Sequence, residues 1–441
     1  MPKKLNALIM GAAGRDFHLF NTFFRKNPYY AIKCFTAAQI PGIAGRSYPK
    51  QMAGKFYKTN IPIFPEEQLA ELIKKYKIER VFFAYSDVSY EYIMHKSALV
   101  NSLGANFSLI SPQYQMIKSK KKVVSVCAVR TGSGKSQVSR LISKILRESG
   151  KKVAVIRHPM PYGDLLKEAV QRFGSYEDLE KHNVTLEERE EYESHIKNGV
   201  TVFAGVDYEK ILRKAEKEAD VIIWDGGNND APFYKPDLHI VIADPFRVGH
   251  ESSYYPSETN VLMADALIIN KVNTAPKENV AQLKQNLKKL NSNAEIIEAN
   301  SAIFLEGNSN LAGKKVLVVE DGPTLTHGGM NIGAGFIAAQ KAGAEIIDPR
   351  PYAVGSIKAV FEKFTQLKEV LPAMGYSEQQ LKELEQTINA VPCDLVLSGT
   401  PIDLGKLVKT RKPIQRVSYE LEEISGQTTI KSLLQKYKII K

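Results

Sequence analysis

Apolar and polar positions along this chain form a repeating pattern, in which short apolar runs are followed by stretches with helical spacing. Residues 65–77 illustrate the helical part, since Leu69, Leu72, Ile73 and Tyr76 fall on one face. The apolar runs predict strands at 5–10, 31–37, 80–85, 106–110, 122–129, 152–156, 221–224, 238–243, 266–269, 294–299 and 315–319. Alternating strands and helices are typical of parallel sheets, so the pattern predicts an α/β fold.

The sequence VRTGSGKS at residues 129–136 lies between a strongly apolar run and a helix-like stretch. This order is typical of P-loop nucleotide-binding proteins, in which backbone N–H groups of a glycine-rich turn surround the phosphates. Lys135 would reach the β- and γ-phosphates, and the Ser136 hydroxyl would bind Mg²⁺. Val129 stands where the usual pattern has its first glycine. Arg130 either contacts a phosphate or faces solvent. The predicted nucleotide contacts in this stretch are Arg130, Thr131, Gly132, Ser133, Gly134, Lys135, Ser136 and Gln137.

A second motif, VIIWDGGNND at residues 221–230, has four apolar residues that end in Asp225. A carboxylate at the end of such a strand binds Mg²⁺ directly or through water, because this ion prefers oxygen ligands. Ser136 and Asp225 are therefore the predicted metal ligands. Further along, Arg247 is a candidate phosphate clamp, since its guanidinium matches phosphate geometry. His250 is either a proton carrier or a surface histidine.

The segment IINKVN at residues 268–273 resembles the N-K-x-D base-recognition motif of GTPases. Asn270 is predicted to contact the base and Lys271 to pack on it. Asn273 replaces the carboxylate that would accept two hydrogen bonds from guanine, whereas an amide accepts only through its oxygen. ATP is therefore at least as well supported as GTP.

These motifs and the breaks between them divide the 441 residues into three segments, the number that the length suggests. Residues 1–118 are predicted to form a Rossmann-like N-terminal domain, and residues 119–312 a P-loop NTPase domain with a mainly parallel sheet. Residues 313–441 form a C-terminal α/β segment. The turn GAAGRD in the first segment lacks a third glycine, which favours a tight turn without a cofactor over NAD binding. The acidic run EEREEYE in the second is interpreted as a solvated helix face, with a lid near the nucleotide as the alternative.

The C-terminal segment carries three polar, glycine-rich loops after predicted strands. One contains Asp321, Thr324, Thr326, His327, Gly328 and Gly329; the second Asp348, Arg350 and Tyr352; the third Ser398, Gly399, Thr400 and Asp403. Small residues, hydroxyls and a histidine can form an anion-binding nest. We expect the loops to converge on a substrate cleft, and the alternative is that they serve turn geometry alone.

Net charge, cysteine content and the length of the apolar runs limit the classes of binding partner and the compartment. The net charge of +12 suits either a small polyanionic substrate or a nucleic acid. Lysine and arginine are dispersed and no aromatic-plus-basic motif accompanies them, which argues against nucleic acid. The three cysteines are far apart, and no apolar run is long enough to span a membrane, so a cytoplasmic protein without a membrane partner is expected. A homodimer is the expectation from the frequency of symmetric enzymes.

The motifs TGSGKS, WDGGNND, ADPFRVGHE, YPSETN, INKVNTA, EDGPTLTHGGM, DPRPYAVGSI, LPAMGYS and SGTPIDL cover nearly the whole length. Together they resemble the cyclic 2,3-diphosphoglycerate synthetase family, whose members are also described as predicted GTPases of the P-loop class. The resemblance implies a ligase that uses ATP and Mg²⁺ to close 2,3-bisphosphoglycerate into a cyclic phosphoanhydride, releasing ADP and phosphate. Lys135, Asp225, Arg247 and His327 are then the candidate catalytic residues. The alternative is a P-loop GTPase that acts as a regulatory switch or a metal-insertion chaperone, which INKVN keeps open.

Overall fold

A mostly parallel sheet flanked by helices forms the N-terminal domain of the computed structural model, which describes residues 4–38, 43, 45–158, 163–307, 310–326, 329–367, 369–374, 378–400, 402–424, 426 and 428–441. Its strand order is β3-β4-β2-β1-β5-β7, and only β3 runs antiparallel to its neighbour. The strands are β1 (Leu5–Met10), β2 (Tyr30–Ala37), β3 (Ser47–Tyr48), β4 (Ile61–Pro65), β5 (Arg80–Phe83) and β7 (Asn106–Ser108). The helices include α1 (Gly14–Leu19), α2 (Lys50–Ala53), α3 (Leu69–Lys75) and α4 (Tyr90–Ser102). Apolar clusters cover both faces of the sheet, as the continuous apolar strands require.

The central domain is built on a second sheet with the order β10-β11-β9-β12-β8-β13-β15-β16. All of its pairs except β10–β11 are parallel. The strands are β8 (Lys122–Ala128), β9 (Val153–Arg157), β10 (Gln171–Phe173), β11 (Thr201–Ala204), β12 (Val221–Asp225), β13 (Leu238–Ala243), β15 (Ala266–Ile269) and β16 (Glu295–Leu305). The helices include α5 (Lys135–Glu148), α6 (Tyr176–Lys181), α7 (Leu186–Lys197), α8 (Tyr208–Glu218), α9 (His250–Ser253), α10 (Ser257–Met263) and α11 (Lys277–Leu290). The predicted α/β class is confirmed.

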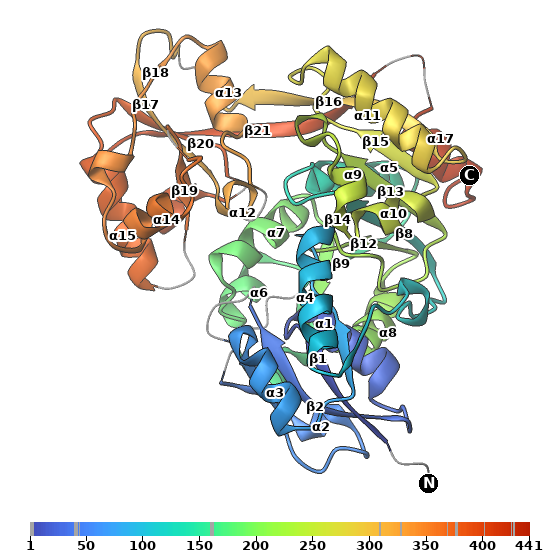
Figure 1. The fold of residues 1–441 in the computed structure, drawn as a ribbon. Coiled ribbons are helices and arrows are strands. Elements are labelled where there is room, and N and C mark those ends of the chain that lie inside the picture. The colour runs from blue at the N-terminus through green and yellow to red at the C-terminus, as the bar shows by residue number, and fades with distance from the viewer. Residues whose placement is uncertain are drawn as a thin grey trace.

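The C-terminal domain extends this same sheet sideways (Figure 1). Strand β16 pairs antiparallel with β21 (Ile414–Glu423), and the order continues β21-β20-β17-β18. The remaining elements are β17 (Lys315–Asp321), α12 (Gly322–Leu325), α13 (Ala334–Lys341), β18 (Glu345–Ile346), α14 (Gly355–Lys363), β19 (Leu371–Ala373), α15 (Glu378–Ala390), β20 (Leu395–Ser398), α16 (Leu404–Leu407) and α17 (Ile430–Lys436). Helix α17 returns to the central domain, where Leu433 and Leu434 share a buried cluster with Ile142 of α5. The last residues thus pack on the central domain, although the sequence pattern grouped them with the C-terminal segment.

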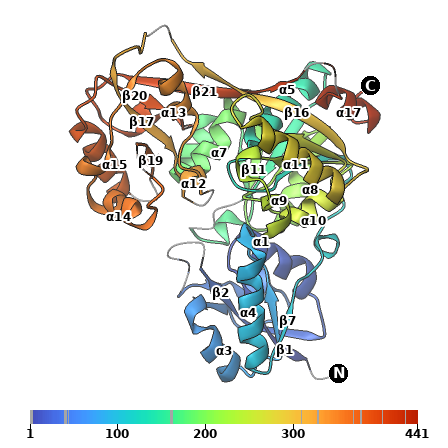
Figure 2. The ribbon, with the colours of Figure 1, turned by 45° about the horizontal axis from the view of Figure 1, so that its top comes forward.

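The N-terminal and central domains meet in a packed interface. Strand β6 (Val88–Ser89) of the first pairs antiparallel with β14 (Tyr254–Tyr255) of the second. The His18 ring stacks on Phe233 with centroids 4.1 Å apart, and burial lowers the pKa of His18 to about 3. Figure 2 shows the N-terminal domain below the other two.

The acidic run at residues 187–193 lies in α7 and is not simply a solvated face. Its Tyr192 is fully buried and stacks on Phe173, and Glu191 pairs with Arg157 at 2.6 Å. Helix α7 therefore contacts the carboxyl end of β9, beside the nucleotide loop. Within the described part of the chain, no helix has the length and apolarity needed to cross a membrane.

Candidate nucleotide site

The phosphate loop joins the end of β8 to the start of α5, as its sequence predicts. Gly132 and Gly134 have φ angles of +79° and +111°, which residues with side chains rarely adopt. A Cβ on Gly134 would lie 2.1 Å from the Asn270 side-chain nitrogen, so only glycine fits there. Val129 needs no such freedom, because it continues the strand and its N–H donates to the Ile242 carbonyl at 2.9 Å. The departure from the usual pattern therefore leaves the loop intact.

Three side chains from the β13 and β15 loops each take one carbonyl of loop residues 131–133. The donors are Arg247, Lys271 and Asn270, at 2.7, 2.8 and 3.0 Å in that order. Asp244 accepts from Arg247 and Lys271 at 2.8 and 2.7 Å and fixes both. With its carbonyls held from one side, the loop can direct N–H groups toward an anion on the other.

Arg247, which was predicted to bind phosphate, and Asn270 and Lys271, which were predicted to contact the base, therefore bind the phosphate loop in this structure. Asn273 exchanges hydrogen bonds of 3.2 Å with the backbone of Ser301, so its amide anchors β16. Contact of Asn270, Lys271 and Asn273 with a base, and of Arg247 with a phosphate, stays a prediction.

Lys135 and Gln137 leave the start of α5 in different directions. The Lys135 amine donates to the Asn228 carbonyl at 2.5 Å, in the loop after β12. Burial lowers the pKa of Lys135. The Gln137 amide donates to the Ser301 hydroxyl at 3.0 Å, toward β16. Ser136 lies between them and lines the cavity described below.

Asp225 ends β12 in a fully buried position, next to residues that the sequence did not single out. Arg157 of β9 pairs with its Oδ2 at 2.5 Å, and His195 of α7 lies 3.4 Å away. Burial by itself would raise the pKa of Asp225, but Arg157 and then His195 hold it well below its usual range. Its Oδ1 has no hydrogen-bond partner among the described residues.

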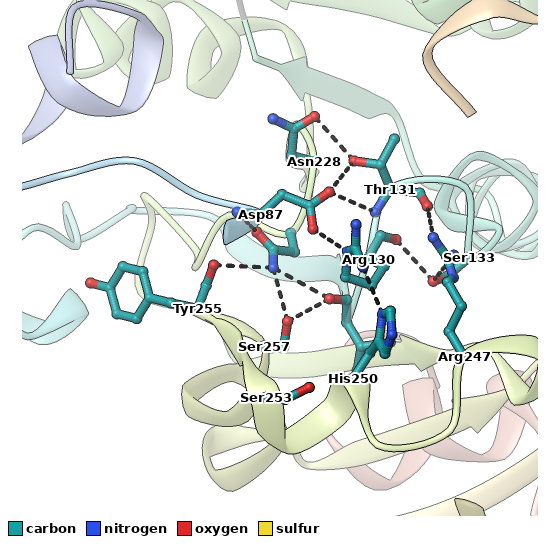
Figure 3. Close-up of polar contacts among 12 residues, drawn as sticks. Asp87, Arg130, Thr131, Ser133, Asn228, Arg247, His250, Ser253, Tyr255 and Ser257 are labelled. Atoms are coloured by element: carbon teal, nitrogen blue, oxygen red, sulfur yellow. Dashed lines mark hydrogen bonds and ion pairs between the residues drawn. The ribbon is translucent and has the colours of Figure 1, made fainter. Parts of the chain in front are cut away.

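The N-terminal domain inserts Asp87 into the phosphate loop (Figure 3). Its carboxylate accepts from the Thr131 N–H at 3.2 Å and the Thr131 hydroxyl at 2.7 Å, and it forms an ion pair with Arg130. Asp87 has a φ of +58°, a sparsely populated region for a residue with a side chain. Its N–H donates to the Asn229 side chain at 2.8 Å, so this residue joins two nucleotide-site loops.

Arg130 is buried, so the alternative that it faces solvent is wrong. Besides Asp87, it donates to Nδ1 of His250 at 2.6 Å and lies 3.8 Å over the Tyr254 ring. Burial, together with Arg130 and Arg247, lowers the pKa of His250 to about 4. The imidazole is therefore neutral at pH 7 and acts here as an acceptor.

One cavity of about 1120 Å³ borders all three domains. Gly132, Gly134, Lys135 and Ser136 line its middle. Arg15, Asp16, Tyr85, Ser86 and Asp87 line the N-terminal wall, and Glu320, Asp321, Thr324, Gly333, Lys363 and Gly399 are among the residues on the C-terminal wall. The C-terminal domain reaches the phosphate loop itself, since a Cβ on Gly132 would meet the Thr324 methyl group at 3.0 Å.

The three predicted C-terminal loops do not all reach this cavity. Residues of the first and third loops line it, whereas Asp348 and Arg350 pair with each other at 2.7 Å and are not among its described lining. His327 lies outside the described residues. Glu320, next to the first loop, is buried and accepts from the Phe336 N–H at 2.8 Å. Burial raises the pKa of Glu320 to about 8.

A glycine-rich phosphate loop at the carboxyl end of a buried parallel strand, with a lysine and a strand-ending aspartate beside it, defines a P-loop nucleotide-binding protein. Over 436 residues the chain is 57% identical to the arginine synthetase ArcE of Thermococcus kodakarensis, and the match covers 99% of this chain and 97% of that protein. The chain belongs to the family of this synthetase and is a ligase-type enzyme. The comparison names a synthetase and does not name a cyclic 2,3-diphosphoglycerate synthetase. The P-loop part of the resemblance is supported by the geometry of the phosphate loop itself.

No model of a known protein family matches the chain. Among solved structures, it is similar to LpxK of Aquifex aeolicus in complex with ATP, with 14% identity and a TM-score of 0.42, over 84% of this chain and 98% of that one. It is also similar to the hydrogenase maturation factor HypB of Archaeoglobus fulgidus, with 19% identity and a TM-score of 0.27, over 41% and 81% of the two chains. Both similarities are too low to bear on function.

Proposed function

We propose that this enzyme makes arginine by joining a nitrogen donor to a ureido amino acid, citrulline, with cleavage of ATP to ADP and phosphate. The observation that carries the proposal is the single cavity in which the phosphate loop faces walls of mixed charge. Arg15 and Asp16 lie on one wall, and Glu320, Asp321 and Lys363 lie on the other. The 57% identity to an arginine synthetase supports the same reaction.

The bond changes follow from the chemistry of the ureido group. Its oxygen attacks the γ-phosphorus of ATP, the bond from that phosphorus to ADP breaks, and a phosphorylated isourea forms. Ammonia then attacks the central carbon, the carbon–oxygen bond breaks and phosphate leaves. One proton is lost from the added nitrogen, and the product carries a guanidinium group. Phosphoryl activation is needed because the ureido oxygen is otherwise a poor leaving group.

The chain's own residues supply positioning and charge for the first step. Lys135 and the loop N–H groups would hold the β- and γ-phosphates and stabilise charge that develops on them. Arg157 lies on the cavity lining beside Asp225 and is a second cation near the transferred group.

The residues present fit a magnesium ion. The buried Oδ1 of Asp225 has no partner among the described residues, which suits a metal or a metal-bound water. Ser136 and Arg157, the ion-pair partner of Asp225, line the cavity. Ser136 and Asp225 would hold the ion, which when bound offsets phosphate charge. No cluster of three or more potential metal-binding side chains occurs among the described residues.

The charges of the cavity favour an amino acid over 2,3-bisphosphoglycerate as the second substrate. Among the described lining residues of the C-terminal domain, Lys363 is the one cation, against the carboxyl groups of Glu320 and Asp321. In the central domain, Arg247 and Lys271 are already paired with Asp244, and Arg157 is paired with Asp225 and Glu191. In the N-terminal domain, Arg15 lies 3.8 Å from Asp230. A bisphosphate beside ATP would need more available cations than these walls offer, whereas a zwitterion with an uncharged ureido tail would not.

The test is an assay of the purified enzyme with Mg²⁺, ATP, citrulline and ammonium, with arginine and ADP measured by mass spectrometry and chromatography. We expect arginine and ADP in equal amounts, with neither formed when citrulline is omitted. Parallel reactions replace ATP by GTP, or citrulline by 2,3-bisphosphoglycerate. ATP turnover stimulated by the bisphosphate, with a cyclic product, would replace this proposal with the diphosphoglycerate reaction. GTP turnover indifferent to both substrates would favour a switch.

A further inference from the structure

The contacts of Lys135 indicate that the terminal phosphate of a bound nucleotide would face the N-terminal domain. The lysine of a phosphate loop contacts the β- and γ-phosphates, and the Lys135 amine here points at the Asn228 carbonyl. Asn228 in turn contacts the Thr131 hydroxyl at 3.1 Å, and that hydroxyl donates to Asp87 at 2.7 Å. Figure 3 shows Asn228, Thr131 and Asp87 together on this side of the loop. A γ-phosphate held by Lys135 would therefore lie next to Asp87 of the N-terminal domain.

The other end of the nucleotide points away from that domain. Gln137, one residue beyond the P-loop serine, is bound to Ser301 of β16, and Ser301 also holds Asn273. Ser301, Ile303 and Tyr419 line the cavity here, on the strands that lead to the C-terminal domain. The base and ribose would thus lie toward β16 and β21.

A phosphoryl acceptor approaches roughly in line with the leaving ADP, from the side opposite to it. On that side the cavity is lined by residues of the N-terminal domain, with Arg15, Asp16, Tyr85 and Ser86 beyond Asp87. The acceptor subsite therefore falls between the phosphate loop and the N-terminal sheet. The sequence pattern had instead suggested the C-terminal loops as the substrate cleft.

Asp16 is the group on this wall that calls for a ligand. Asp16 is 3% exposed, and its Oδ2 accepts a hydrogen bond from the Ala13 N–H at 2.7 Å. Its Oδ1 is buried and has no hydrogen-bond partner among the described residues. A buried carboxylate oxygen left without a donor is costly, and a cationic ligand group would satisfy it.

Arg15 supplies the opposite charge. It is 5% exposed, and its guanidinium donates to the Tyr85 carbonyl at 3.2 Å and the Tyr255 hydroxyl at 3.1 Å. Its Nη1 also lies 3.8 Å from Oδ1 of Asp230, so one guanidinium stands between two buried carboxyl groups, and burial raises the pKa of Asp16 to about 7. A ligand ammonium group beside Asp16 would favour its ionised form, and the pair at the start of α1 then matches the two charges of an α-amino acid.

Resting on the proposed function, we propose that the N-terminal domain binds the acceptor amino acid, with its α-ammonium group on Asp16 and its α-carboxylate toward Arg15. The ureido end then extends past Asp87 to the γ-phosphate. The Asp16 carboxyl group lies against Gly11 in the turn after β1, where a Cβ would come within 2.2 Å of its Oδ1. A dinucleotide would place its pyrophosphate at this turn, so an acidic side chain here disfavours a dinucleotide.

The test compares citrulline with 5-ureidopentanoate, which has the same chain without the α-ammonium group. The unsubstituted enzyme should prefer citrulline by about 100-fold or more in kcat/KM, as expected for a lost hydrogen bond to a charged partner. In Asp16→Asn, which retains an oxygen for the Ala13 N–H, this preference should fall to about tenfold or less, while the KM for ATP is unchanged. Asp321→Asn is the matched control, because Asp321 also caps a backbone N–H and lines the opposite wall of the same cavity. It should keep the unsubstituted preference.

The outcomes distinguish a failure of the proposed function from a failure of the proposed amino-acid subsite. If the unsubstituted enzyme makes no arginine, the proposed function and this subsite are both overturned. If it makes arginine but Asp16→Asn keeps the preference, or Asp321→Asn loses it, the subsite alone is overturned. A raised KM for ammonium with an unchanged preference would assign Asp16 to the nitrogen donor and also overturn the subsite. If Asp16→Asn does not fold, the unsubstituted enzyme still tests the subsite, because equal use of the two substrates would overturn it.

Discussion

Replacing Asp87 by alanine should destabilise the junction between the N-terminal domain and the phosphate loop. The side chains of Asp87 and Arg130 are 5% and 7% exposed, so their ion pair is buried. Removing one partner of a buried pair typically costs about 3–5 kcal/mol, because the other charge stays buried. Arg130 keeps its bond to His250 and its contact with the Tyr254 ring, which places the expected loss near about 3 kcal/mol.

The chain offers a built-in probe for this measurement. Trp224 is its single tryptophan, it is fully buried, and its ring lies 4.5 Å from Phe233, which stacks on His18 of the N-terminal domain. Urea unfolding followed by tryptophan fluorescence therefore reports on this junction. We expect the free energy of unfolding of Asp87→Ala to fall by about 3 kcal/mol with an unchanged dependence on urea.

The matched control is Tyr90→Phe, which removes a hydrogen bond of 2.9 Å to Glu258 across the same interface without touching the phosphate loop. That change should cost about 0.5–1.5 kcal/mol. If Asp87→Ala costs no more than Tyr90→Phe, the ion pair does not hold the two domains together and the reasoning from burial is refuted.

Three further substitutions test other parts of the site. Lys135→Ala should abolish nucleotide turnover and leave the thermal midpoint within a few degrees, and normal turnover would remove the phosphate-loop interpretation. Asp225→Asn should sharply weaken the dependence of turnover on Mg²⁺, and an unchanged magnesium titration would place the metal elsewhere. Glu320 has a pKa raised by burial to about 8 against 4.5 when exposed, so its contribution to stability is present below pH 4.5 and lost as the pH rises to about 8. Glu320→Gln should therefore flatten the pH dependence of unfolding in that window, and identical pH profiles for the two proteins would contradict the burial argument.

The strands were predictable because they are buried on both faces. Strands β1, β13 and β15 have the predicted bounds, and β8 and β12 differ by one residue at the end. These runs are mostly apolar, with single polar residues such as Asn6, Ser125 and His239, and a mostly apolar run is typical of a parallel strand that is covered on both faces. The sequence predicted that strand β16 ends at residue 299, because polar Asn300 and Ser301 interrupt the apolar run there. In the structure the strand continues to Leu305, since its second half pairs with β21.

The parts of the site that were predictable are those in which neighbouring residues in the sequence form one motif. The phosphate loop is of this kind, since its two glycines, its lysine and its helix are contiguous. Asp87 and Arg157 could not be found this way, because each acts on a loop brought to it by long-range packing. The one local signal for Arg157 is a charged residue ending an apolar run, next to the strand that ends in Asp225. For Asp87 it is a short polar turn after β5, where a positive φ is visible only in the structure.

The proposed function depends on transfer of the γ-phosphoryl group of ATP to the ureido oxygen of an amino acid. The most direct measurement uses citrulline labelled with ¹⁸O in the ureido group, with ammonium, ATP and Mg²⁺, and determines the isotope in the released phosphate. If the ureido oxygen is phosphorylated, we expect one ¹⁸O atom in the phosphate for each arginine formed. Arginine formed together with unlabelled phosphate would contradict this expectation.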